Sequence, residues 1–97
     1  MSIDIQVLKK TFKVLYFAAA KDATGLTNEV IPFPEESEDP ISVPRLFEIL
    51  EARHPKLKEK KILGSAAVAV NLEYVEVSDG RINAGDEVAI IPPVSGG

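Results

Sequence analysis

The sequence of 97 residues contains no cysteine and no tryptophan, and its only histidine is His54. Without cysteine, the chain can form no disulfide, no thiolate metal site and no iron–sulfur cluster, and it offers no nucleophilic thiol. One histidine cannot make a multi-histidine metal site, and the acidic residues lack the spacing of a calcium-binding loop. We therefore predict no metal site, and we expect His54 to end a helix at the surface or partly packed.

A dense run of positive charge and a long apolar run are also absent. Eleven Lys and Arg against fifteen Asp and Glu give a formal net charge of -4, and no basic stretch could follow a phosphate backbone. The longest apolar run, 14–20, is far shorter than the roughly 20 residues of a membrane span, and its β-branched and aromatic residues are more typical of a strand than of a signal peptide. These absences predict a cytosolic protein that binds neither nucleic acid nor a membrane.

The chain length fits one domain with a modest core. We predict an N-terminal extension over 1–11, a folded domain over 12–91 and a C-terminal tail over 92–97. Runs of apolar and β-branched residues predict strands over 13–19, 27–33, 66–71, 74–77 and 87–91. Gly, Asp and Ser predict polar turns over 21–25, 78–80 and 85–86. Charge runs predict a solvated acidic loop over 35–40 and a basic connector over 56–63 that allows one further helical turn.

The segment between Ser42 and Pro55 carries the clearest helix signals. Ser42 is a typical N-cap residue, Pro44 is harmless in the first turn, and Pro55 ends the helix. An apolar stripe at i, i+3, i+4 and i+7 spacing consists of Val43, Leu46, Phe47 and Leu50. The resulting β-β-α-β-β-β order predicts an α+β fold, a mixed sheet with one main helix across one face. A β-grasp with parallel first and last strands fits this order, and an open α+β sandwich is the alternative.

The first and last strands are apolar on both faces, whereas one helix covers only one face of a sheet. The residues of one phase are Val14, Tyr16 and Ala18 with Val88 and Ile90, and those of the other are Leu15, Phe17 and Ala19 with Ala89 and Ile91. A sheet with one solvated face normally alternates apolar and polar residues, so the second face is predicted to bind a protein partner, with Phe17 and Tyr74 as anchors. The alternative is that the extension or the basic connector covers this face.

The last six residues, 92–97, follow the final strand and read PPVSGG. The two prolines favour a stiff extended exit, and six residues reach about 20 Å at full extension. Pro93, Val94 and Ser95 therefore lead to Gly96 and Gly97, which lack Cβ atoms and can pass a narrow channel. This arrangement makes the carboxylate of Gly97 the functional group. An ionised carboxylate is a poor electrophile, so its use requires activation, most simply as an acyl-adenylate made by an ATP-dependent partner.

Three segments, KVLYFAA (13–19), AVAVN (67–71) and GDEVAIIPPVSGG (85–97), resemble the small subunits of molybdopterin synthase, and the similarity covers nearly all of 12–97. The resemblance implies a ubiquitin-like β-grasp fold and a sulfur carrier in molybdenum cofactor biosynthesis. It implies that Gly97 is adenylated by an E1-like adenylyltransferase/sulfurtransferase and converted to a thiocarboxylate. The tail would then enter the large subunit and donate sulfur to cyclic pyranopterin monophosphate, forming the dithiolene of molybdopterin.

The same resemblance assigns further roles. Phe17, Tyr74 and Ile91 match the family's hydrophobic partner-binding surface, although Tyr74 replaces a more usual aliphatic residue. The chain would be no enzyme alone, because the catalytic groups belong to the large subunit. It would bind no cofactor, since the activating enzyme uses the ATP. Two small and two large subunits would form a heterotetramer.

Three alternatives share parts of this pattern. A sulfur carrier for thiamine synthesis or tRNA thiolation would have the same fold, tail and activation. A ubiquitin-like protein modifier would join Gly97 to lysines through isopeptide bonds. A plain interaction module would keep full activity without Gly97.

Overall fold

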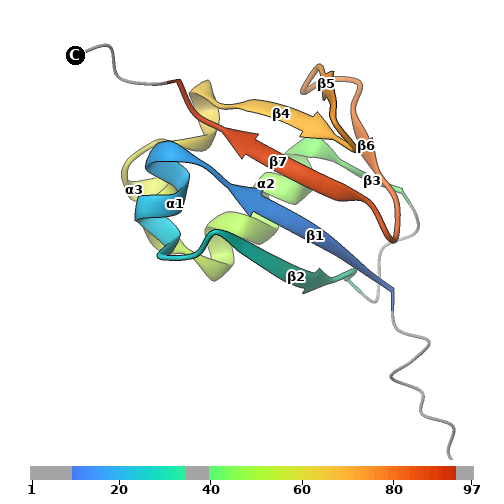
Figure 1. Cartoon of the computed structure of the whole chain (residues 1–97), viewed down its shortest axis with the longest axis horizontal. Helices are drawn as coiled ribbons and strands as arrows, with labels where there is room; N and C mark the ends of the chain where they lie inside the picture. The colour runs from blue at the N-terminus through green and yellow to red at the C-terminus, as the bar shows by residue number, and fades with distance from the viewer. Residues whose placement is uncertain (1–9, 35–39, 94–97) are drawn as a thin grey trace, which may run out of the picture.

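The computed structural model describes residues 10–34 and 40–93. Figure 1 shows a twisted sheet with the main helix behind it and shorter helices at one end. The elements, in chain order, are β1 (Thr11–Tyr16), α1 (Ala18–Thr24), β2 (Asn28–Pro32), β3 (Ile41–Ser42), α2 (Val43–Arg53), α3 (Pro55–Glu59), the 3₁₀ helix η2 (Leu63–Ser65), β4 (Ala67–Val70), β5 (Glu73–Val75), β6 (Arg81–Ile82) and β7 (Glu87–Ile91).

The main sheet has the strand order β2-β1-β7-β4-β5. Strands β1 and β7, the first and last, are parallel neighbours at its centre, with Tyr16 opposite Ile90. The pairs β1–β2, β4–β7 and β4–β5 are antiparallel. A second sheet contains only β3 and β6. The predicted α+β class and the ubiquitin-like β-grasp arrangement are confirmed.

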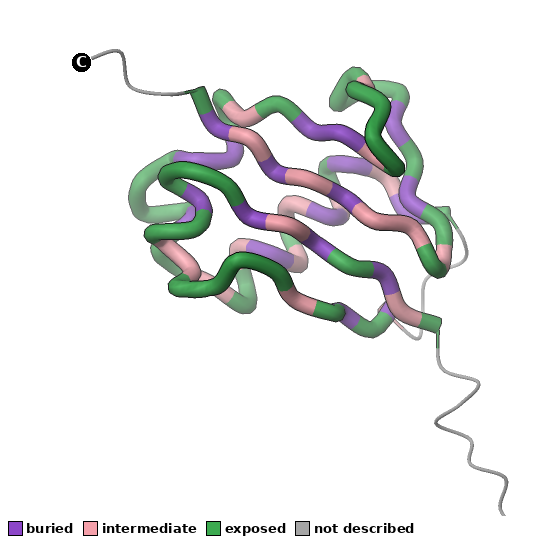
Figure 2. The backbone as a smooth tube through the Cα atoms, in the orientation of Figure 1, coloured by how far each residue is buried: buried purple, intermediate pink, exposed green. Residues whose placement is uncertain are grey.

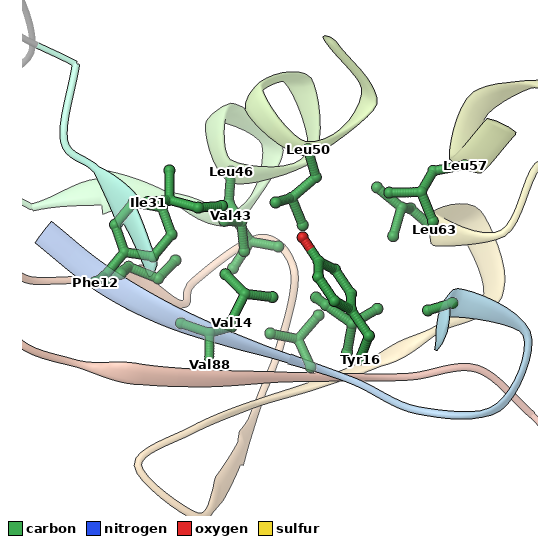
Figure 3. Packing of buried hydrophobic residues seen from close by; sticks show 14 of the residues in the cluster. Phe12, Val14, Tyr16, Ile31, Val43, Leu46, Leu50, Leu57, Leu63 and Val88 are labelled. Carbon is green, nitrogen blue, oxygen red and sulfur yellow. The ribbon is translucent and has the colours of Figure 1, made fainter. Parts of the chain in front are cut away.

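The core lies between the main sheet and helix α2. Figure 3 shows Val14 and Tyr16 of β1 pointing toward Leu46 and Leu50 of α2. Within the predicted apolar stripe of α2, three residues are fully buried and the fourth, Phe47, packs partly buried against the core. Burying one such large apolar side chain stabilises the fold by about 1.5–3 kcal/mol, so this layer is the main source of stability.

Helix α2 begins and ends close to the predicted positions. Its N-cap residue is Ser42, whose Oγ accepts a hydrogen bond from the Arg45 backbone N–H at 3.2 Å, and Pro44 occupies the first turn. His54 caps the C-terminus and is partly buried, as expected. Pro55 ends α2, but it also occupies the first turn of the next helix, α3.

The prediction of a strand through Ala19 followed by a polar turn over 21–25 is wrong. Strand β1 ends at Tyr16, and helix α1 follows. Alanine has the highest helix propensity, and the apolar residues after Phe17 bury a helical face through Ala20 rather than two faces of a strand. The backbone changes direction at Ala18, whose φ is 50°, and the helix ends at Gly25 with φ 74°. Only the end of the predicted turn is therefore correct.

The basic connector over 56–63 contains the helical turn that the sequence allowed, and it packs against the core rather than forming only a solvated charge run. It contains α3 and the start of η2, because Leu57 and Leu63 are buried in the main core while the lysines between them stay exposed. Helix α3 packs against both α1 and α2. The predicted extension over 1–11 is also too long, since Thr11 already pairs with Pro32. Residues 1–9 and 35–39 lie outside the described part of the chain.

Candidate partner-binding face

Paired residues on neighbouring strands lie on the same face of a sheet, so the register defines the surface opposite α2. Leu15 of β1 pairs with Ala89 of β7, Ala89 pairs with Ala69 of β4, and Ala69 pairs with Tyr74 of β5. These four residues form one row across four strands. Ala69 is buried but lies outside the main core, as expected for a small side chain on this second face.

A second row lies nearer the C-terminal end of β7. The Phe17 backbone N–H donates to the Ile90 carbonyl at 3.2 Å, so Phe17 continues the pairing of β1 beyond its last strand residue. Ile91 pairs with Ala67 on the other side of β7. We call the two rows together the outer face, which consists of Leu15, Phe17, Ala67, Ala69, Tyr74, Ala89 and Ile91.

The two predicted anchors of the outer face are well exposed. Phe17 is 46% exposed and Tyr74 is 73% exposed, whereas Ile91 is half-buried. Figure 2 shows buried and half-buried residues alternating along β7. The residues of β7 that face away from α2 are therefore less covered than those that face it. The alternative that the basic connector covers this face is wrong, because Leu57 of α3 is buried on the α2 side. Phe17, Tyr74 and Ile91 are thus on one face, and their binding role stays a prediction.

Phe17 owes its exposure to a change of secondary structure. It is the N-cap of α1 and has an extended backbone, with φ −122° and ψ 156°. The next residue turns the chain into a helix that packs beside α3, so no further strand residue shields the ring. The large aromatic side chain therefore lies at the point where the sheet ends, and Figure 1 shows β7 ending at the same end.

The tail leaves the domain from this end. Strand β7 stops at Ile91, Pro92 is buried, and Pro93 is exposed. Val94, Ser95, Gly96 and Gly97 lie outside the described residues. Four residues beyond Pro93 reach about 13 Å when extended, so a partner that receives Gly97 in a buried site must come close to Phe17 and Ile91.

A polar cluster on the α2 side was not predicted from the sequence. Glu29 of β2 accepts a hydrogen bond from the Tyr16 hydroxyl at 2.8 Å through Oε1, and His54 Nε2 lies 2.8 Å from the same oxygen. Arg53 donates to Oε2 through Nε and Nη2 at 3.0 and 2.7 Å. The missed signal was a charged residue, Glu29, in the same inward phase as Ile31 and Phe33.

The cluster changes the acidity of two of its members. Burial acts to raise the pKa of Glu29, but the hydrogen bonds from His54, Arg53 and Tyr16 outweigh burial and hold that pKa below its ordinary value. Burial, and then the neighbouring carboxylate, raise the pKa of the Tyr16 hydroxyl far above its ordinary value. Glu29 therefore stays ionised and Tyr16 neutral near pH 7. These hydrogen bonds hold β1 and β2 against the C-terminal end of α2. Tyr16, the β1 residue of the cluster, directly precedes Phe17.

No second kind of site emerges from the described residues. Over 10–34 and 40–93, no three His, Asp or Glu side chains are grouped as a metal ion requires. Within the same ranges, no helix is long and apolar enough to cross a membrane.

The profile of the ThiS family matches residues 14–97. The chain belongs to the ThiS family. Among curated relatives, the molybdopterin synthase sulfur carrier subunit of Phaeosphaeria nodorum is 47% identical over 93 residues, covering 89% of this chain and 90% of that protein. The subunit of the same name from Homo sapiens is 40% identical over 87 residues, covering 88% and 92%. The predicted resemblance is confirmed.

Solved structures of similar proteins share this ThiS-family fold. The putative molybdopterin converting factor subunit 1 of Pyrococcus furiosus has a TM-score of 0.68 at 33% identity, covering 88% of this chain and 99% of that chain. SAMP1 of Haloferax volcanii has a TM-score of 0.71 at 26% identity, covering 90% and 99%. A complex of subunits 1 and 2 of molybdopterin-converting factor from Helicobacter pylori gives 0.58 at 25% identity, covering 90% and 99%.

Proposed function

We propose that this chain is the sulfur carrier subunit of molybdopterin synthase and that the carboxylate of Gly97 carries the sulfur. The observation that supports this most strongly is the combination of an apolar outer face and a tail that leaves from its edge, in a ThiS-family chain whose relatives carry that name. A partner can hold the domain by the face while the tail enters the partner's active site.

The first half of the chemistry requires an activating enzyme. The Gly97 carboxylate attacks the α-phosphate of ATP, which releases pyrophosphate and forms an acyl-adenylate. A sulfur nucleophile then displaces AMP and leaves a thiocarboxylate. This chain contains no cysteine to donate sulfur, so an E1-like adenylyltransferase/sulfurtransferase supplies both the nucleotide site and the sulfur transfer. The chain itself binds no cofactor.

The second half takes place in the large subunit. The thiocarboxylate sulfur bonds to a carbon of cyclic pyranopterin monophosphate and displaces an oxygen substituent of that carbon. Water then hydrolyses the acyl–sulfur bond, which leaves the sulfur on the pterin and regenerates Gly97 as a carboxylate. Because a dithiolene contains two sulfurs, two charged tails are consumed for each molybdopterin. Because the tail is tethered to a docked domain, its sulfur arrives at a high effective concentration. The carrier positions the sulfur, and the large subunit supplies the catalytic groups. The solved complex of the two Helicobacter pylori subunits supports such a partner. We place two copies of each subunit in a cytosolic heterotetramer.

The mass of the intact chain tests the carrier chemistry. The protein is recovered from cells that contain its activating and sulfur-donating enzymes, and a chain lacking Gly97 is prepared in parallel. We expect the full chain to gain the mass difference between sulfur and oxygen, and the truncated chain to gain nothing. An unmodified terminus under these conditions contradicts the proposal.

A protein modifier is the second candidate, because the similar Haloferax volcanii protein is a small archaeal modifier protein by name. The same mass experiment separates the two. A modifier appears as conjugates in which Gly97 is amide-linked to lysines of other proteins, and conjugation is lost when those lysines are replaced. A carrier for thiamine synthesis or tRNA thiolation would gain the sulfur but would not convert cyclic pyranopterin monophosphate with the large subunit.

A further inference from the structure

The turn between β4 and β5 contains a leucine in a backbone conformation that leucine rarely adopts. Asn71 has φ 51° and Leu72 has φ 75°, so both central residues of this two-residue turn are left-handed. Hairpins with this geometry favour Asn at the first position and Gly at the second. Asn71 follows the rule, but Leu72 does not, and a bulky residue at such a φ is a genuine outlier.

Packing inside the domain does not offset the backbone strain at Leu72. Its side chain is 90% exposed, more than any other large hydrophobic residue in the described part of the chain. The position therefore combines backbone strain with apolar exposure, and glycine or asparagine would avoid both. Strain that the fold itself does not use is a reason to look for a function.

Hydrogen bonds hold the turn in place, so the backbone that carries Leu72 is fixed. The Asn71 side chain donates to Asp86 Oδ1 at 3.0 Å and accepts from the Glu87 backbone N–H at 3.0 Å. Asp86 Oδ2 also accepts from the Asn83 backbone N–H at 2.8 Å. These bonds anchor the tip of the hairpin to the start of β7. A side chain on a rigid support loses little entropy on binding, which favours a role as an anchor.

Leu72 precedes Tyr74 of the outer face by two residues at the tip of the same hairpin, so a partner that covers Tyr74 comes within reach of Leu72. Ala67 pairs with Ile91 at the tail end of β4, and Asn71 bonds to Glu87 at the other end. A partner that receives the tail and also reaches Leu72 therefore spans the full length of the sheet. Such an area suits a standing complex of two subunits better than a brief encounter, which buries less surface.

From these observations we infer that the large subunit binds the β4–β5 hairpin as well as the tail end of the outer face, and that Leu72 inserts into an apolar pocket of that subunit. The inference rests on the proposed function. It adds a second anchor, distant from Gly97, that contributes to affinity without taking part in sulfur transfer.

The test compares the affinity of the chain for its large subunit with the thermal stability of the chain alone. Leu72→Asn keeps the left-handed turn and removes the apolar side chain, so we expect at least tenfold weaker binding with an unchanged or higher Tm. Leu72→Met keeps an apolar side chain and is expected to retain the affinity. The matched control is Lys61→Asn, which changes an exposed residue with φ 54° after α3 and should leave binding unchanged.

Phe17→Asp separates failure of this inference from failure of the proposed function. If Phe17→Asp weakens binding and Leu72→Asn binds like the unsubstituted chain, the hairpin anchor is overturned while the carrier proposal stands. If neither variant weakens binding, the large subunit does not use the outer face. A self-association of the chain that Leu72→Asn abolishes, with large-subunit affinity unchanged, would assign the hairpin to a second copy and also overturn the inference.

Discussion

The two faces of one sheet have opposite roles, although the same strands build both. On the α2 side, Val14, Val88 and Ile90 are completely buried beneath the helix. On the outer face, alanines occupy the centre and the large residues Phe17 and Tyr74 are exposed. Successive residues of a strand point to opposite faces, so one residue can stabilise the core while the next one is available for binding.

This difference separates the residues that stabilise the fold from those that are available for binding. The inner face removes large side chains from water, and it should therefore determine whether the chain folds. The outer face keeps apolar surface in contact with water, which is unfavourable for the isolated chain and useful only when a partner covers it. Substitutions on the two faces should separate stability from binding.

The largest effect is expected from Leu50→Ala on the inner face. Leu50 is fully buried against Tyr16, and removing a buried leucine side chain also leaves a cavity, so the free energy of unfolding should fall by about 2–5 kcal/mol. Urea denaturation measures this change. Leu72→Ala is the matched control, since the same atoms are removed at an exposed position, and it should change stability by less than about 0.5 kcal/mol. Equal effects of the two substitutions would contradict the division between faces.

Phe17→Ala is expected to have the next largest effect, on binding. A large aromatic anchor that a partner buries typically contributes about 2 kcal/mol or more, so the affinity for the large subunit should fall by more than tenfold. Titration calorimetry with the large subunit measures the loss. The control is Leu26→Ala, which removes an exposed apolar side chain outside the outer face. If both variants bind equally well, the outer face is not the docking surface.

Glu29→Gln should have a smaller and pH-dependent effect on stability. The carboxylate accepts charge-assisted hydrogen bonds, and half-exposed Arg53 contributes less than a buried partner would, so we expect a loss of about 1–2 kcal/mol at pH 7. Because folding lowers the pKa of Glu29, its contribution is present above the unfolded value of about 4.3 and disappears as the pH falls through the folded value.

Denaturation at pH 7 and pH 3 therefore tests the cluster directly. The stability difference between Glu29→Gln and the unsubstituted chain should shrink at the lower pH. Glu48→Gln changes the exposed Arg45–Glu48 pair on α2 and should show little difference at either pH. A difference that stays constant with pH would mean that the Glu29 charge does not stabilise the fold.

Local signals explain which parts of the fold the sequence predicted. The cap at Ser42, the apolar stripe of α2 and the β-branched run of β7 each lie within one segment, and all three predictions are correct. Helix α1 was missed because its alanines directly continue an apolar strand, where the strand and helix periods cannot be told apart over so few residues. The helical turn allowed in the basic connector is present as α3, but its burial was not predicted, because lysines surround its single buried leucine, Leu57.

The candidate site divides in the same way. Phe17 and Ile91 were predicted on one face because they share the outward phase of their strands, and because the β-grasp arrangement makes those strands parallel neighbours. The Glu29 cluster was not, since Arg53 and His54 lie 24 and 25 residues further along the chain and only the tertiary fold brings them to Glu29. Leu72 was not singled out for another reason: a leucine after an asparagine carries no turn signal, and only its φ in the folded chain reveals the strain.

The smallest effect, on stability, sharpens the comparison between the faces. Tyr74 is a large aromatic residue in the main sheet, yet it is 73% exposed, so Tyr74→Ala should change the free energy of unfolding by less than about 0.5 kcal/mol. Tyr16, also a tyrosine in this sheet, is buried with a bonded hydroxyl, so Tyr16→Ala should cost about 3–5 kcal/mol, in the range of phenylalanine truncations. Urea denaturation of both variants measures the two losses in the free energy of unfolding, which can then be compared. A marked loss of stability from Tyr74→Ala would show that the outer face supports the isolated fold, and its exposed side chains would then need no partner to explain them.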